Sequence, residues 1–283
     1  MNKAKKYFAV ALLLSLLAWG LAEVFSGRII LPQSFQLGPL TVHFYGLTMA
    51  AAVLAGLLYA RKTAEEYGFT KSQAEDLALY LVPVSFVFAR AYHVASSFAY
   101  YKLHPLDALK VWHGGLSIYG AVLGGVLALV ILRKVFHTKS SLLSSFDWLA
   151  PAVLLGQIIG RFGNFFNYEA YGNPTGLPWK MFVPEQFRLQ GYTDYSYYHP
   201  WFLYELLGNL FIFWLLSRFF KKLGPGSLFF GYVLLYNVLR FCLEFIRLDS
   251  VFVGTVRQNA VVSLILAFIG LFGLILSHKR QNV

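Results

Sequence analysis

The sequence predicts an all-α polytopic membrane protein with about eight transmembrane helices, organised as a single membrane domain over residues 1–283. Hydrophobic residues make up 58% of the chain and charged residues only 13%, whereas about a quarter of the residues in a soluble domain are charged. The mean hydropathy is correspondingly high, at +0.57. Apolar runs long enough to cross a bilayer occupy residues 7–25, 41–60, 77–97, 115–132, 146–166, 201–219, 227–246 and 259–277.

The first run allows two interpretations. Three lysines within the first six residues precede an apolar stretch that ends in Gly20-Leu21-Ala22, and both a cleaved signal peptide and an uncleaved first helix have this pattern. At about 19 residues, the run is longer than the apolar core of a usual signal peptide, which favours an uncleaved helix. Residues 1–22 are therefore either removed or part of an N-terminal membrane helix at 7–25.

The basic residues indicate a membrane topology rather than a nucleic-acid-binding surface. The net charge is +11, but lysines and arginines gather in short clusters at the ends of the apolar runs, which is how topology is encoded. With the N-terminus inside, the inner loops carry twice as many basic residues as the outer loops. We therefore expect both termini in the cytoplasm if the first helix is retained, and a small outward-facing loop subdomain at residues 168–199. No nucleic-acid partner is expected.

Cysteine and metal chemistry are not expected. Cys242 is the only cysteine, which excludes an internal disulfide and a cysteine-built metal site. No two histidines have the His-x-x-x-His spacing of a zinc site. The sequence therefore predicts neither a metal site nor a cofactor.

Polar side chains inside two of the apolar runs are the main functional signal. A charged side chain at the centre of a bilayer costs roughly 2.5–3.5 kcal/mol on insertion, so such residues usually have a function. Arg161, Asn164 and Tyr168 are three and four residues apart, which predicts that they share one helix face. Two glycines close to Arg161 would let a neighbouring helix or a lipid headgroup approach the backbone.

The run at 227–246 carries a second polar stripe. Tyr236, Arg240 and Glu244 follow one another at intervals of four, so a helix places their side chains on one face. A neutral Arg240–Glu244 pair that joins helices is one interpretation. Together, however, Arg161 and Arg240 have few acidic residues near them in the sequence, which predicts an unneutralised site for an anion. A guanidinium fork suits phosphate in particular.

The segment from Gly160 to Gly172 reads GRFGNFFNYEAYG and closely resembles the prolipoprotein diacylglyceryl transferase family, whose signature is G-R-x-G-N-F-x-N-x-E-x-x-G. Further motifs follow the family's order. They are Gly38-Pro39 with His43 to Leu47, Arg90 in VFARAYHV, Trp112 to Ser117, Asp147 with Pro151, His199-Pro200 with Leu203 to Glu205, and Y-x-x-x-R-F-x-x-E-F-x-R from Tyr236 to Arg247.

The chain departs from this family at two points. Tyr119 stands where many members have a histidine that has been considered as a catalytic base. The apolar run before Gly38 also adds a helix to the seven that the family usually has.

The resemblance implies a transferase of the bacterial plasma (inner) membrane that acts in the first step of lipoprotein maturation. Such an enzyme moves the diacylglyceryl group of phosphatidylglycerol to the lipobox cysteine thiol of a prolipoprotein, which forms a thioether and releases glycerol phosphate. The expected partners are phosphatidylglycerol, the prolipoprotein signal peptide and membrane lipids, with no cofactor. The active site should lie towards the outer leaflet, where the donor lipid and the signal-peptide cleavage region meet.

The predicted roles follow from this chemistry. Arg161 and Arg240 should bind the phosphate, because positioned guanidiniums stabilise the charge that develops on the leaving group. The wider lipid-binding and phosphate-binding set is Tyr45, Arg90, Asn164, Asn167, Glu169 and Gly172, in which Glu169, together with Glu244, should orient the arginines. The candidate bases for the acceptor thiol are Glu244, Tyr236 and Tyr119. The supporting residues are Asp147, His199 and Glu205.

Two other function classes remain open. A non-enzymatic transporter of anionic lipids would also need buried arginines and glycine-lined grooves, but it should have an internal symmetry that is not visible in the sequence. A membrane-embedded phosphatase or acyltransferase would need a nucleophile–base motif, and the sequence contains no recognisable one.

Overall fold

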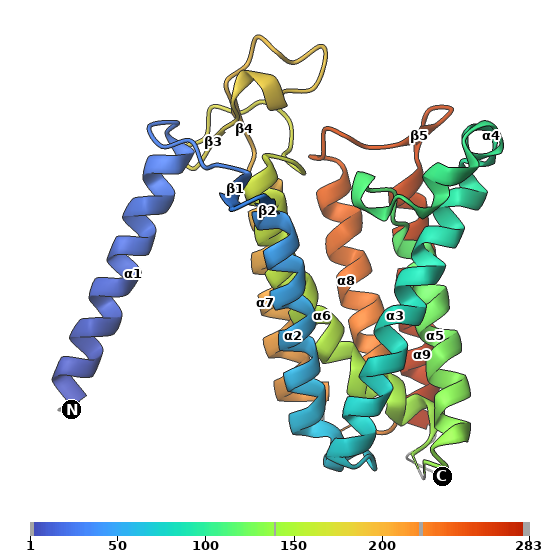
Figure 1. The fold of residues 1–283 in the computed structure, drawn as a ribbon. Coiled ribbons are helices and arrows are strands. Elements are labelled where there is room, and N and C mark those ends of the chain that lie inside the picture. Colours follow the sequence, from blue (N-terminus) through green and yellow to red (C-terminus); the bar gives the residue numbers. More distant parts are fainter. Residues whose placement is uncertain (1–2, 139, 221–222, 280–283) are drawn as a thin grey trace. The chain divides into compact units, whose positions relative to one another are not determined.

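The computed structural model describes residues 3–138, 140–220 and 223–279, which are mostly helical (Figure 1). They form two compact units, one of residues 1–56 with 153–283 and the other of residues 57–152. Helices α2 (Phe44–Thr63) and α6 (Leu142–Asn167) each continue from one unit into the other. The first two and last four residues lie outside the described part, so the cytoplasmic placement of the termini stays a prediction.

The first unit holds most of the long helices. Its elements, besides parts of α2 and α6, are α1 (Lys3–Phe25), β1 (Ser34–Leu37), β2 (Leu40–His43), β3 (Met181–Phe182), η4 (Glu185–Phe187), β4 (Tyr197–Tyr198), α7 (Trp201–Phe219), α8 (Ser227–Glu244), β5 (Phe252–Val253), β6 (Val256–Arg257) and α9 (Gln258–Lys279). The strands pair as β1 with β2, β3 with β4 and β5 with β6, each in a small antiparallel ladder. Helices α8 and α9 pack closely because Gly270 and Gly273 face Leu234 and Phe230 without a side chain between them.

The second unit is built on α3 (Lys71–Ser96) and α5 (Ile118–Val135). The shorter elements are η1 (Ala64–Tyr67), α4 (Phe98–Leu103), η2 (Pro105–Leu109) and η3 (Val111–His113). Gly120 and Gly124 let α5 approach the backbone of α3 near Phe88. The buried indole of Trp148 stacks on Phe69 and donates a hydrogen bond of 2.9 Å to the Ala60 carbonyl.

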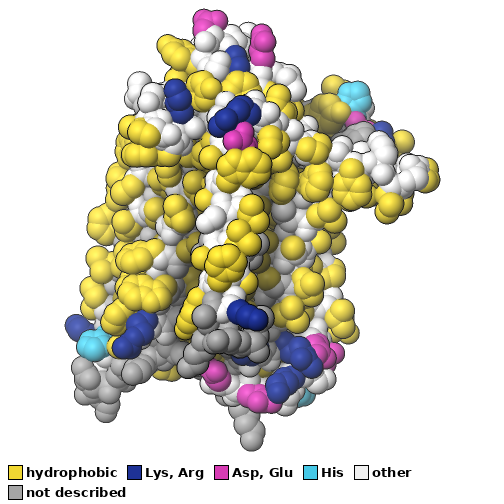
Figure 2. Space-filling view, turned by 90° about the vertical axis from the view of Figure 1, so that its left-hand side faces the viewer, with side chains coloured by type: hydrophobic (Ala, Val, Ile, Leu, Met, Phe, Trp, Pro, Cys, Tyr) yellow, Lys and Arg dark blue, Asp and Glu magenta, His cyan; other side chains and the backbone are white. Residues whose placement is uncertain are grey.

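Seven of the described helices are long and apolar enough to cross a membrane, in agreement with seven of the predicted runs. Hydrophobic side chains cover the helices on the face drawn in Figure 2, and charged side chains gather towards the helix ends. Helix α3 begins at Lys71, earlier than the predicted residue 77, because Thr70 and Gln73 form a reciprocal capping box.

The predicted N-terminal run forms helix α1, but α1 is not among those seven helices; its stretch Ser15–Phe25 is apolar and shorter. Whether it crosses the membrane stays a prediction. The C-terminal end of α1 and the residues directly after it pack against the segment that follows α6. Phe182 lies so close to Gly27 that a Cβ there would be 2.6 Å from the ring, and the Tyr197 hydroxyl donates to the Ser26 carbonyl at 3.2 Å.

Residues 168–199 connect α6 to α7 and contain the β3–β4 ladder, at the ends of both helices (Figure 1). Tyr171, Met181, Val183 and Tyr198 of this segment are buried in a core that they share with residues of α1, α6 and α7. Whether residues 168–199 form an outward-facing loop subdomain stays a prediction.

Candidate active site

Glu205 on α7 lies at the centre of a cluster of ionisable side chains in the first unit. Its carboxylate is fully buried and accepts hydrogen bonds from Arg161 Nη2 at 2.7 Å, from Arg240 Nη1 at 3.4 Å and from the Tyr236 hydroxyl at 3.1 Å. A buried carboxylate without such partners would be strongly destabilising. Three helices thus meet at one carboxylate.

Glu244 is the second buried carboxylate of the cluster. It accepts a hydrogen bond from Arg240 Nη2 at 3.0 Å and one from Asn259 Nδ2 at 3.3 Å. Its own backbone carbonyl, at the end of α8, accepts from Arg257 Nη1 at 2.8 Å. The predicted stripe of Tyr236, Arg240 and Glu244 is therefore confirmed, and Glu244 forms an ion pair with Arg240. Its role in orienting Arg240 stays a prediction.

The prediction that Arg161 and Arg240 form an unneutralised pair was wrong. Both contact Glu205, and Arg240 also contacts Glu244, so two guanidiniums face two carboxylates. This balance of charges could not be inferred from the sequence, because Glu205 lies 44 residues after Arg161 on another helix. Each guanidinium still has five N–H groups and uses two of them on side chains of the described residues. Capacity for an anion's oxygens therefore remains.

Asn164 links Arg161 to Glu169 at the end of α6. Its Oδ1 accepts a hydrogen bond of 3.1 Å from Arg161 Nη1, and its Nδ2 donates one of 2.7 Å to Glu169 Oε1. Glu169 is thus connected to Arg161 through the amide of Asn164. Its predicted role in orienting the arginines stays a prediction.

Tyr168 does not share the face of Arg161 and Asn164, which corrects another prediction. Helix α6 ends at Asn167, and Tyr168 has a left-handed backbone with φ of +53°. Its buried hydroxyl accepts a hydrogen bond of 2.6 Å from the Leu31 amide, and its ring stacks on Phe187. Burial of this hydroxyl raises the pKa of Tyr168.

Gly163 and Gly172 lie where other segments pack too closely to leave room for a side chain. A Cβ at Gly163 would lie 2.8 Å from Thr48 Oγ1 and 2.9 Å from the Tyr45 ring, so the predicted Tyr45 packs directly on α6. Gly172 pairs with Arg247 in an antiparallel bridge, and a Cβ there would lie 2.8 Å from the Ile246 carbonyl oxygen. Gly172 therefore has a packing role in this structure.

Asn167 and His199 lie where the helices meet the 168–199 segment. The Asn167 carbonyl accepts a hydrogen bond of 3.2 Å from Gln33 Nε2. His199 Nδ1 is 3.0 Å from the Tyr204 hydroxyl, which also accepts from Trp179 Nε1 at 2.8 Å. Burial lowers the pKa of His199, so its ring stays neutral at neutral pH.

Sequence reasoning missed Trp201, the first residue of α7. Its indole is fully buried, and three guanidinium carbons lie near the ring centre: Arg240 at 4.7 Å, Arg247 at 5.0 Å and Arg161 at 5.6 Å. The available signal was its position four residues before Glu205, which places both on one helix face. The contacts themselves come from other helices and could not be inferred from this spacing.

Arg247 follows the end of α8 and forms a two-point ion pair with Asp249, with distances of 2.5 and 2.7 Å. Burial alone would raise the pKa of Asp249, but the hydrogen bonds and charge of Arg247 outweigh it and hold that pKa below its usual range. Asp249 is therefore ionised and fixes the Arg247 guanidinium.

Three of the predicted residues, Arg90, Tyr119 and Asp147, belong to the second unit. Tyr119 is 43% exposed, and its ring centre is 6.1 Å from that of Tyr92. Asp147 is buried beside the Trp148 core. The role of Tyr119 as a base and that of Asp147 as a supporting residue stay predictions.

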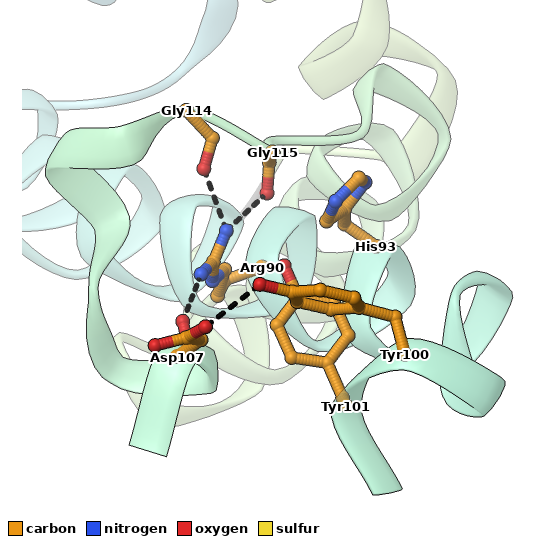
Figure 3. Close-up of a pocket in the computed structure, with 7 residues that line it drawn as sticks. All are labelled: Arg90, His93, Tyr100, Tyr101, Asp107, Gly114 and Gly115. Carbon is orange, nitrogen blue, oxygen red and sulfur yellow. Dashed lines mark hydrogen bonds between the residues drawn. The ribbon is translucent and has the colours of Figure 1, made fainter. Parts of the chain in front are cut away.

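Arg90 organises the loop before α5 (Figure 3). Its guanidinium donates to the backbone carbonyls of Asp107, Ala108, Gly114 and Gly115, at distances of 2.5 to 2.9 Å. The side chain is buried, and these contacts use much of its hydrogen-bonding capacity. This geometry favours a role in holding the loop, and the predicted lipid contact of Arg90 stays a prediction.

A pocket of about 170 Å³ adjoins Arg90 and is also lined by His93, Tyr100 and Tyr101 (Figure 3). The Asp107 carboxylate at its edge accepts from Lys110 Nζ at 2.7 Å and from the Tyr100 hydroxyl at 2.8 Å. The first of these hydrogen bonds contributes most to lowering the pKa of Asp107. The polar groups of this pocket are thus largely engaged with one another.

Known proteins match most of the chain in sequence. A family model described as prolipoprotein diacylglyceryl transferase matches residues 32–276. The chain belongs to this family. A Gloeobacter violaceus protein named phosphatidylglycerol–prolipoprotein diacylglyceryl transferase is 42% identical over 254 residues, which cover 88% of this chain and 94% of that protein.

Two further bacterial relatives carry the same name. The protein from Acaryochloris marina is 41% identical over 246 residues, covering 86% of this chain and 89% of its own length. The protein from Thermotoga petrophila is 38% identical over 265 residues, covering 93% and 90%. The resemblance found in the motifs is therefore confirmed. The region matched by the family model contains the whole Glu205 cluster and begins after α1.

Proposed function

We propose that this protein transfers the diacylglyceryl group of phosphatidylglycerol to the lipobox cysteine of a prolipoprotein. The names of its relatives support this activity. The observation that carries the proposal is the pair of guanidiniums on Glu205, which offers two planar forks to a phosphodiester inside a membrane protein.

In the proposed reaction the cysteine thiolate attacks the glyceryl carbon that carries the phosphate oxygen. A carbon–sulfur bond forms, the carbon–oxygen bond breaks, and its electron pair remains on the oxygen of the departing glycerol phosphate. Arg161 and Arg240 bind the phosphate and stabilise the charge that grows on it, an effect that is stronger where water is excluded.

The thiol must lose its proton, because the thiolate is the nucleophile. Of the candidate bases Glu244, Tyr236 and Tyr119, we favour Tyr236, whose hydroxyl already donates to Glu205. Tyr236 would accept the thiol proton while passing its own to Glu205. A protonated Glu205 no longer neutralises Arg161 and Arg240, so proton transfer would leave both guanidiniums free to hold the more negative leaving group.

We also propose that the site opens towards the outer leaflet of the bacterial plasma membrane. The cluster lies near the end of α6, the beginning of α7 and the end of α8, on the side where residues 168–199 join α6 and α7. The charge bias of the loops supports an outward position for that segment. In this topology α1 is an additional N-terminal membrane helix.

Reconstitution in vesicles tests the function directly. Vesicles that contain phosphatidylglycerol, the protein and a lipobox peptide should yield a peptide whose mass has increased by the diacylglyceryl group. Arg161→Ala should abolish this product, and a peptide with serine in place of its cysteine should remain unmodified. Movement of labelled lipid between leaflets without any modified peptide would instead indicate a lipid transporter.

A further inference from the structure

Trp201 is held rigidly at the beginning of α7. It is fully buried and packs against Ala170 and Leu243. Its indole Nε1 donates a hydrogen bond of 2.7 Å to the Leu243 carbonyl, near the end of α8. Because a buried indole N–H needs such a partner, this bond fixes the orientation of the ring between two helices.

The ring of Trp201 is a common neighbour of three guanidiniums. Those of Arg240, Arg247 and Arg161 lie 4.7, 5.0 and 5.6 Å from its centre. These distances fall within the range over which the negative face of an indole attracts a cation.

Different carboxylates contact different members of this group of three arginines. Glu205 contacts Arg161 and Arg240, whereas Asp249 contacts Arg247. Among the described residues, Trp201 is the side chain that contacts all three guanidiniums. Like charges repel one another, so an electron-rich ring close to all three guanidiniums lowers the free energy of keeping them together.

We propose that Trp201 is a positioning residue that gathers Arg161, Arg240 and Arg247 into one phosphate-binding group. The inference rests on the proposed function and extends it, because it makes Arg247 a third contributor to phosphate recognition. Trp201 itself touches neither substrate nor leaving group in this arrangement. It acts through the arginines.

A series of ring-fluorinated tryptophans at position 201 tests this role. Each added fluorine weakens the attraction of the ring for cations with little change in its size, so folding should be preserved. Both kcat/KM for phosphatidylglycerol and the affinity for glycerol phosphate should fall stepwise, by roughly 10-fold over the whole series. Fluorination makes the indole N–H a stronger donor, so a purely structural bond to Leu243 predicts no loss.

The same series at Trp214 is the matched control, because this tryptophan lies on the same helix with 54% of its surface exposed. It should leave both quantities unchanged. If fluorination at position 201 changed neither kcat/KM nor the affinity for glycerol phosphate, the proposal for Trp201 would be overturned, even if the unsubstituted protein transfers lipid. A graded loss of glycerol phosphate affinity in a protein that transfers nothing would support Trp201 while rejecting the proposed transfer.

Discussion

Arg161 on α6 and Glu205 on α7 form an ion pair in which Nη2 lies 2.7 Å from Oε1, with the glutamate side chain completely buried. The same carboxylate also contacts Arg240 and Tyr236 from α8. This single group therefore sets both the packing of three helices and the charge balance of the candidate active site.

Removal of the Glu205 carboxylate should destabilise the protein. Glu205→Ala leaves two partly buried guanidiniums without the fully buried carboxylate that they share, and breaking a buried pair costs about 3 kcal/mol. The measurement is thermal unfolding in detergent. Glu75→Ala is the control, because the Arg61–Glu75 pair is about half exposed and should contribute less than about 1 kcal/mol. Equal effects of the two variants would contradict a central role for Glu205.

Arg161→Lys should lower diacylglyceryl transfer by roughly 100-fold, the usual loss when one positioned donor to a developing charge is removed. Arg161 contacts Asn164 and Glu205 through different nitrogens, and a lysine ammonium cannot reproduce this planar fork. Mass spectrometry of the lipobox peptide gives the rate. Near-normal transfer by the lysine variant would show that only the charge matters.

Gly172→Ala should destabilise the junction between the 168–199 segment and the end of α8. The new Cβ would lie 2.8 Å from the Ile246 carbonyl oxygen and 2.9 Å from His199 Cβ, and such overpacking costs about 1–3 kcal/mol. Gly176→Ala is the matched control, since nothing lies within 4 Å of its Cβ position. The two variants should differ clearly in their melting temperatures.

The stability of the fold should decrease as the pH falls below about 6.5, the ordinary pKa of histidine. The pKa of His199 is lowered in the folded state by burial, so the unfolded chain binds the proton first and is favoured as the pH decreases. His199→Gln should reduce this pH dependence between about pH 7 and pH 5. A variant with the same slope as the parent would show that other groups cause it.

Cys242→Ser should retain most of the transfer activity. The residue is exposed and lies off the face that carries Tyr236, Arg240 and Glu244, and the acceptor thiol belongs to the prolipoprotein. The initial transfer rate and the expression level give the comparison. Loss of turnover in a well-expressed serine variant would refute this view of Cys242.

Periodicity along one helix was sufficient to predict the stripe of Tyr236, Arg240 and Glu244, because the helical repeat alone places them together. It failed at Tyr168, where the chain leaves α6 in a left-handed conformation. It also could not reveal that Glu205 neutralises Arg161 or that Trp201 adjoins three arginines. Those contacts depend on which helices are neighbours, and that information lies in tertiary packing.

The distribution of charge over the three helices also constrains how the protein is made. Helix α8 carries Arg240 and Glu244 one turn apart and can enter the membrane as an internally neutral segment. Arg161 on α6 and Glu205 on α7 have their charge partners on other helices, and an isolated intramembrane charge is unfavourable. Helices α6 and α7 should therefore leave the translocon as a pair. The site can then assemble only after the 44 residues that separate the two charges have been synthesised.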